Sequence, residues 1–124
     1  MSDDRAAQIR ERITIEPAGR TVTATFEGAA LARSDNALLL KERGHDPVFY
    51  IPKADVEMAL LTPTDHHTTC PWKGEARYWS IRDGAKTAEN AVWAYDDPHE
   101  HPPVDRIAGH VAFDKRFVQV TQAD

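Results

Sequence analysis

Apolar residues in this chain recur at every second position over short runs, and turn-forming residues separate one run from the next. In the clearest run, Val22, Ala24 and Phe26 alternate with threonines and end at Glu27-Gly28. A period of two residues places alternate side chains on opposite faces of a β-strand, whereas the apolar face of a helix repeats every three to four residues. The chain is therefore restricted to a fold built mainly from short strands.

The same pattern predicts about eight short strands and almost no helix. Pro52 ends one strand because proline lacks the N–H that a sheet needs, and residues 52–57 fit a single helical turn. Segments 62–65 and 96–103 have the composition of loops, and the polar run 66–69 has no period that decides between strand and loop. A mainly β domain with a curled or barrel-like sheet follows. The expected strands are residues 22–26, 29–33, 38–40, 48–51, 76–81, 86–95, 107–113 and 116–120.

The length of the chain indicates one domain, because 124 residues are too few for two independent cores. Residues 1–12 precede the alternating pattern, and Ile9 and Ile13 lie there at helical spacing. A helix this short is marginal by itself, so the segment is expected to be either a short helix or a mobile arm. Residues 13–124 are expected to form the single β-rich domain.

Charge and hydropathy exclude several classes of protein. The net charge is −5 and the Lys and Arg residues are scattered, whereas a general nucleic-acid-binding protein needs a basic face. No apolar run approaches the length of a membrane span. The acidic start lacks the features of a secretory signal, and the lone cysteine cannot form an intramolecular disulfide. We expect a soluble, cytoplasmic protein that binds neither nucleic acid nor membrane.

Residues that carry chemistry are concentrated in segment 70–74, whose sequence is CPWKG, and in the two runs that follow it. This region holds the only cysteine and all three tryptophans. A hairpin between residues 76–81 and 86–95 is expected to bring its aromatic residues within reach of one another. Those residues are Tyr78, Trp79, Trp93 and Tyr95.

A ligand pocket is the function that this region suggests. Aromatic rings make pocket walls, lysine and arginine bind phosphate or carboxylate, and glycine lets a backbone approach a ligand closely. The same residue types also fill ordinary cores and solvated turns, so both interpretations stay open. The predicted ligand-binding residues are Cys70, Lys73, Gly74, Arg77, Trp79, Trp93 and Tyr95.

Cys70 and Lys73 are the candidates for catalysis. A cysteine nucleophile needs a base within hydrogen-bond reach, and in an extended segment His66 lies too far along the strand to touch the sulfur. Another histidine, such as His45 or His110, would have to reach it from across the fold. Lys73 is a nearer neighbour, across a proline turn. An unreactive, packed thiol is the alternative, because unpaired cysteine is often buried.

Two further polar groups carry weaker signals. Residues 97–101 (DPHEH) hold two histidines, but in an irregular proline-rich loop with no third fixed ligand, so no metal site is expected. Asp55 and Glu57 have the D-x-E spacing of carboxylates that hold metals in nucleotide transfer, yet no glycine-rich loop accompanies them. Asp55 is better explained as the acid at the start of a short helix. No cofactor is expected.

Four motifs occur in order: YIPxxDV at 50–56, TCPWKGxAxYW at 69–79, AxWxY at 91–95 and IxGxVAF at 107–113. Together they resemble a family of small bacterial proteins called domain of unknown function 427, which also carries a nucleotidyltransferase-like label. The resemblance covers most of the chain from about Val22 to Phe113. It implies a compact β-rich fold similar to the β-tent folds of some zinc proteins. The paired cysteines of such zinc sites are missing, so no structural zinc is expected.

Three hypotheses for function follow. The first is a small-molecule binding domain whose aromatic pocket holds a small polar or anionic ligand. The second is an enzyme that uses Cys70 or Lys73 on such a ligand. The third is a protein-interaction module, a homodimer formed through an exposed β edge.

Overall fold

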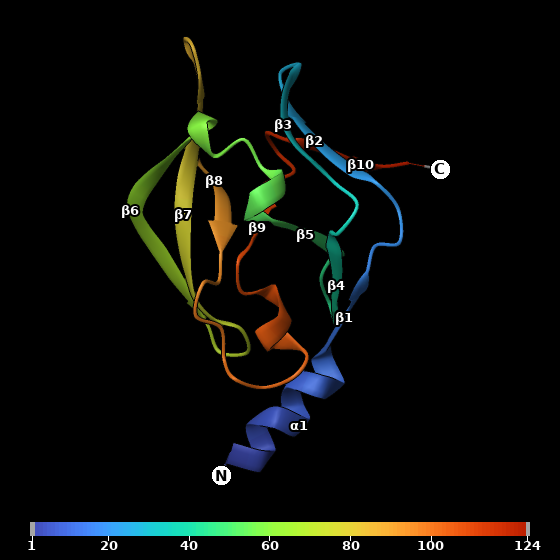
Figure 1. The fold of residues 1–124 in the computed structure, drawn as a ribbon. Helices are drawn as coiled ribbons and strands as arrows, with labels where there is room; N and C mark the ends of the chain where they lie inside the picture. The colour runs from blue at the N-terminus through green and yellow to red at the C-terminus, as the bar shows by residue number, and fades with distance from the viewer. Residues whose placement is uncertain (1, 124) are drawn as a thin grey trace.

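Ten β-strands and one α-helix make up the fold in the computed structural model, which describes residues 2–123 (Figure 1). The prediction of a mainly β protein is confirmed. The strands are β1 (Ile13–Pro17), β2 (Val22–Phe26), β3 (Ala29–Ser34), β4 (Leu38–Glu42), β5 (Val48–Pro52), β6 (Leu61–Cys70), β7 (Gly74–Asp83), β8 (Lys86–Ala94), β9 (His110–Phe113) and β10 (Gln119–Gln122).

The strands form two antiparallel sheets. The larger has seven strands in the order β1-β4-β5-β9-β8-β7-β6, and the smaller has three in the order β10-β2-β3. Figure 1 shows β6, β7 and β8 on one side of the molecule and β4 and β1 on the other, with β9 and β5 between them. Over the described residues the sheets stay open and do not close into a barrel. The curvature of the large sheet therefore brings its two ends to face each other.

Helix α1 (Ser2–Arg12) occupies the segment for which a helix or a mobile arm was expected. Its Ile9 side chain is fully buried, in the same apolar cluster as Ile13 and Ile15 of β1. The Arg12 guanidinium lies 4.4 Å from the centroid of the Trp72 ring. The helix is thus fastened to the sheet, and Met1 lies outside the described residues.

The structure contains a strand where a loop was predicted over residues 62–65. These residues belong to β6, which pairs with β7 at the edge of the large sheet. Pro63 is tolerated because an edge strand has no partner on its outer side, and the register of β6 shifts between Pro63 and His67. The polar composition that suggested a loop reflects exposure of this edge strand on both faces.

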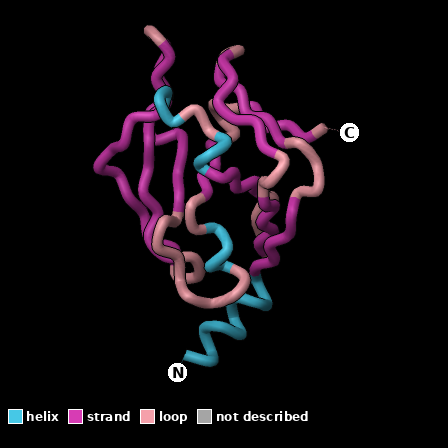
Figure 2. Tube along the Cα trace, viewed as in Figure 1, coloured by secondary structure: helices cyan, strands magenta, loops and turns pink. Residues whose placement is uncertain are grey.

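Three more boundaries differ from the sequence-based expectation. Strand β1 was not predicted, although Ile13 and Ile15 alternate with exposed residues. Strand β9 starts only at His110, because residues before it form the 3-10 helix η3 (Val104–Ile107). Strand β10 starts three residues later than expected, after a turn in which Phe117 and Val118 N–H groups bond to the Asp114 carbonyl. Two more 3-10 helices, η1 (Lys53–Asp55) and η2 (Met58–Leu60), include the turn expected after Pro52 (Figure 2).

Two apolar clusters hold the fold together, on opposite faces of the large sheet. The first joins the small sheet to the large one and includes Phe26, Leu31, Trp79 and Phe113. The second lies toward α1 and η3 and includes Ile9, Leu40, Tyr50, Tyr95 and Ile107. Strand alternation assigns neighbouring residues of one strand to different clusters, so Trp79 packs in the first and Tyr78 against the second.

Candidate functional site

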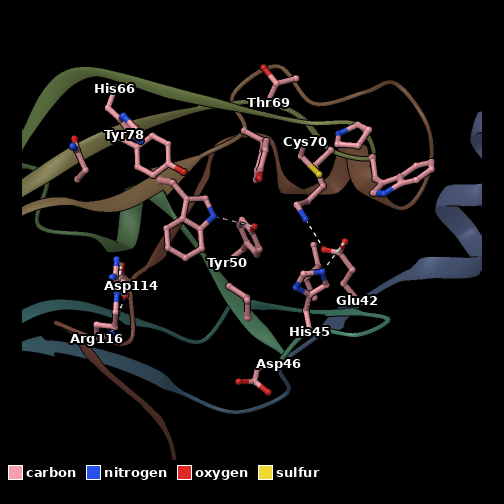
Figure 3. A pocket seen from close by; sticks show the side chains of 18 of the residues that line it. Glu42, His45, Asp46, Tyr50, His66, Thr69, Cys70, Tyr78, Asp114 and Arg116 are labelled. Carbon is pink, nitrogen blue, oxygen red and sulfur yellow. Dashed lines mark hydrogen bonds and ion pairs between the residues drawn. The ribbon is translucent and has the colours of Figure 1, made fainter.

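A cavity of about 710 Å³ lies where β4 and β5 face the β6–β7–β8 end of the large sheet (Figure 3). Its walls come from the end of β4 and the loop after it, from β5, from the turn after β6, from β7 and β8, and from the turn after β9. Elements distant in the sequence therefore contribute to one space. A volume of this size is ordinary for small-molecule sites.

Aromatic side chains form the inner wall of the cavity. The predicted β7–β8 hairpin forms and pairs Tyr78 directly with Trp93, and Tyr95 follows two residues later on the same face, whereas Trp79, expected to join them, lies on the other face. The Trp93 Nε1–H donates to the Tyr50 hydroxyl across a distance of 3.3 Å. The His66 ring meets the Tyr78 ring edge-on, with centroids 4.6 Å apart. Figure 3 shows Tyr50, Tyr78 and His66 directed toward the same space.

A buried ion pair forms one end of the cavity. Lys73 Nζ lies 2.6 Å from Glu42 Oε1, and the two side chains are only 10% and 11% exposed. The ammonium also lies 5.6 Å from the centroid of the Tyr95 ring. His45 Nε2 is 3.9 Å from the other oxygen of Glu42. The lysine charge is therefore neutralised within the protein, with the pair placed beside an aromatic ring.

Cys70 lines the same end of the cavity and is half-buried at the end of β6. Tyr50 and Tyr95 line the same cavity. Figure 3 shows Cys70 and Glu42 in this part of the site. The thiol thus shares the cavity with an ammonium–carboxylate pair and two tyrosines.

Most of the charged side chains that line the cavity are carboxylates. Besides Glu42, the lining includes Asp46, Glu89 and Asp114, against the two cations Lys73 and Arg116. The formal charge of the lining is therefore −2 when its two histidines are neutral. The Asp114 carboxylate accepts hydrogen bonds from Arg116, at 2.7 Å for the shortest, and this holds the pKa of Asp114 below its ordinary value.

Four of the seven predicted ligand-binding residues line the cavity, namely Cys70, Lys73, Trp93 and Tyr95. Gly74, Arg77 and Trp79 lie outside it. For Arg77 and Trp79 the reason is the period of a strand, because they project from the face of β7 opposite to Tyr78. The sequence places these residues in one region but does not say which face each of them occupies.

Arg77 and Trp79 form a separate cluster with Lys53 and Asp96. The Arg77 guanidinium lies 4.7 Å from the Trp79 ring centroid and 3.6 Å from the Asp96 carboxylate. Lys53 Nζ lies 2.7 Å from the same carboxylate and 5.2 Å from the same ring. Lys73 and Arg77 therefore have different acidic partners on different faces, and they do not form the joint anion grip that was expected.

Gly74 is buried and has a φ of +114°, which side chains other than hydrogen rarely allow. A Cβ at this position would lie 3.4 Å from both the Asp97 carbonyl oxygen and the Pro98 Cα. The His99 N–H donates to the Lys73 carbonyl at 3.1 Å. Glycine therefore allows the proline-rich loop 96–103 to approach the backbone closely here, rather than a ligand. This contact holds the loop against the turn that contains Lys73.

Sequence analysis missed several cavity residues, above all Glu42 and Tyr50. Glu42 is 31 positions from Lys73 and has no motif around it beyond the apolar run before it. Tyr50 stood in the YIPxxDV motif, which offered a signal that was not used. Of the two histidines considered as a base from across the fold, His45 lines the cavity and His110 does not.

The weaker sequence signals lie away from the cavity. Asp55 lies in the first turn of η1, as expected, and its carboxylate accepts a hydrogen bond of 2.6 Å from the Ser34 hydroxyl. Among residues 6–123, whose side chains the structure describes, no three His, Cys, Asp or Glu side chains lie close enough together to hold a metal ion. The helices of this part of the chain are too short or too polar to cross a bilayer.

Burial raises the pKa of Tyr50 and of Tyr95 above the ordinary value of 10.0. In the unfolded chain both tyrosines ionise near that ordinary value, so the unfolded state loses protons first and stability falls as the pH rises above about 10. We expect urea unfolding at increasing alkaline pH to show this decline. Tyrosinate absorbance should rise together with unfolding for two of the three tyrosines, and full ionisation of all three in the folded protein would contradict the prediction.

Comparison with protein families gives a match over most of the chain. A family model described as Domain of unknown function (DUF427) matches residues 14–124. This range includes every residue that lines the cavity and leaves out α1. No curated protein matches the chain.

Proposed function

The chain belongs to the family described as a domain of unknown function (DUF427), and because that description names no activity, we propose a function from the cavity: it binds a small polar molecule. The observation that carries the proposal is the cavity of about 710 Å³ with an aromatic wall and a buried ion pair at one end. Aromatic walls with a few fixed polar groups are the usual construction of ligand sites.

The energetics of folding support this proposal. A buried ion pair contributes little net stability, since the cost of removing both charges from water offsets their attraction. Trp93 is only half-buried, although a tryptophan gains most when fully packed. Placing these groups around a space large enough for a ligand costs stability that a closed apolar core would not. Binding is a function that accounts for such an arrangement.

The proposal predicts that ligands stabilise the protein through Trp93. In a thermal-shift screen of nucleotides, acids, amines and neutral polar compounds, we expect hits that raise the melting temperature of the wild type. A ligand at a hundred times its Kd adds about 2.7 kcal/mol of stability. The shift should be lost in Trp93→Ala, each variant being compared with its own ligand-free melting temperature.

Arg77→Ala is the matched control for this screen. Arg77 is on the neighbouring hairpin strand but outside the cavity, so its replacement should leave the ligand shift unchanged. A screen without hits, or hits that survive in Trp93→Ala but not in Arg77→Ala, would contradict the proposed site.

Catalysis by Cys70 is the second candidate, because its half-buried sulfur lines the cavity beside the Lys73–Glu42 pair. A cysteine nucleophile reacts as its thiolate, which the protein must make both available and accessible. If Cys70 is a nucleophile, iodoacetamide should alkylate it faster at neutral pH in the folded protein than in the urea-unfolded chain. A slower rate in the folded protein would instead indicate an unreactive wall residue.

A further inference from the structure

The polar groups of the inner wall are largely bonded to one another. The Glu42 carboxylate binds Lys73, and the Tyr50 hydroxyl accepts the Trp93 N–H. The Asn90 side-chain carbonyl accepts a hydrogen bond of 2.6 Å from Thr64. A ligand that depends on many hydrogen bonds would have to break these contacts, and leaving their partners unpaired is costly. The wall therefore favours a ligand that binds mainly through ring faces.

Ring faces around this cavity already hold cations. Lys73 lies against Tyr95, and Arg12 lies 4.4 Å from the centroid of Trp72. Within the described residues, no lysine or arginine lies over the ring of Trp93, which is half-buried and lines the cavity. The negative face of an aromatic ring attracts a cation, and tryptophan does so most strongly.

The charge of the lining also favours a cation as ligand. The two cations of the lining are each held by a carboxylate, Lys73 by Glu42 and Arg116 by Asp114. The remaining carboxylates, Asp46 and Glu89, give the cavity its formal charge of −2. Asp46 has a basic partner, Lys115, but both of those side chains are more than three-quarters exposed, and Glu89 has no basic partner among the described side chains. An anion entering the cavity is repelled, and a cation is attracted.

From the half-buried ring of Trp93, which no described lysine or arginine covers, and the acidic excess around it, we infer that the ligand of this cavity is an organic ammonium cation, and that methylated or quaternary ammonium groups suit it best. Such groups need no hydrogen-bond acceptor, so they match a wall whose acceptors are already engaged. This inference rests on the proposed binding function and adds the chemical class of the ligand.

The test compares three molecules of nearly the same shape, by calorimetry on the full chain. Choline carries the cation, and its uncharged tert-butyl analogue has carbon in place of nitrogen. The third molecule, tert-butylacetate (the carboxylate 3,3-dimethylbutanoate), carries a negative charge. We expect choline to bind at least about tenfold more tightly than the uncharged analogue, the range that cation–π contacts supply. Trp93→Leu should abolish this preference.

Two exposed glutamates provide a matched pair of variants that leaves the core intact. Glu89 lines the cavity, whereas Glu75 lies on β7 outside it. Glu89→Gln should weaken choline binding about twofold to fivefold, and Glu75→Gln should not, since both remove one charge but only one faces the ligand. Equal losses in the two variants would point to the overall charge and overturn the inference.

The outcomes separate the class of ligand from the existence of the site. Equal affinity for choline and its uncharged analogue, or tighter binding of tert-butylacetate, would overturn the ammonium class and leave the binding function standing. The class is also overturned if other compounds of the wider screen shift the melting temperature through Trp93 while choline does not bind. The binding function proposed for this cavity is contradicted instead by a screen without hits, or by hits that depend on Arg77 and not on Trp93.

Discussion

Replacing Glu42 by leucine is expected to destabilise the fold by about 3 kcal/mol, because it leaves the Lys73 ammonium buried without its counter-charge. Both side chains are about nine-tenths buried, so water replaces the lost partner poorly. The cavity beside the pair admits some water, which is why we place the loss at the lower end of the range for broken buried pairs. Urea unfolding at neutral pH measures it.

The exposed pair Glu16–Lys41 is the control for this prediction. It has a comparable separation of 2.9 Å, and its side chains are 53% and 54% exposed. Glu16→Leu should therefore change stability by less than about 1 kcal/mol. A double variant, Glu42→Leu with Lys73→Met, should recover most of the stability lost in Glu42→Leu, since it removes the unpaired charge. A double variant less stable than the single one would show that the pair itself is not responsible.

Replacing Gly74 by alanine is expected to cost about 2 kcal/mol, within the range for strained backbone positions. Its φ of +114° lies well beyond the small left-handed region that other residues enter, and the added Cβ would press against the main chain of Asp97 and Pro98. The strain would also loosen the loop that Gly74 holds. Urea unfolding should report the loss of stability.

Gly84→Ala is the matched control, because Gly84 also has a positive φ, of +63°, but no atom lies within 4 Å of a Cβ built there. That replacement should cost only about 1 kcal/mol. Hydrogen exchange adds a local readout, since the amide of His99 bonds to the Lys73 carbonyl and should exchange faster in Gly74→Ala than in Gly84→Ala. Equal costs and equal exchange in the two variants would show that the contact with the loop is unimportant.

Local patterns in the sequence correctly indicated most of the fold. Alternation in residues 22–26 and the turn residues after it predicted β2, and Pro52 marked the end of β5. The β7–β8 hairpin followed from two apolar runs around Asp83-Gly84, although the sequence did not show that Tyr78 and not Trp79 shares a face with Trp93. These features depend on neighbouring residues and on the fixed periods of strands, which are visible in a sequence.

The sequence by itself determined a β-rich chain and the region that holds its candidate functional residues. The tertiary structure decided which of those residues line the cavity and which lie on the opposite face of the sheet. Lys73, read from the sequence as a grip for an anion, is neutralised by Glu42 from a strand 31 positions away. Arg77 and Trp79 project from the other face of β7 and meet Asp96 there. Which residues form ion pairs, and which face of a strand lies toward the cavity, depend on how the sheet curves. This arrangement joins residues far apart in the chain, so no local sequence pattern reveals it.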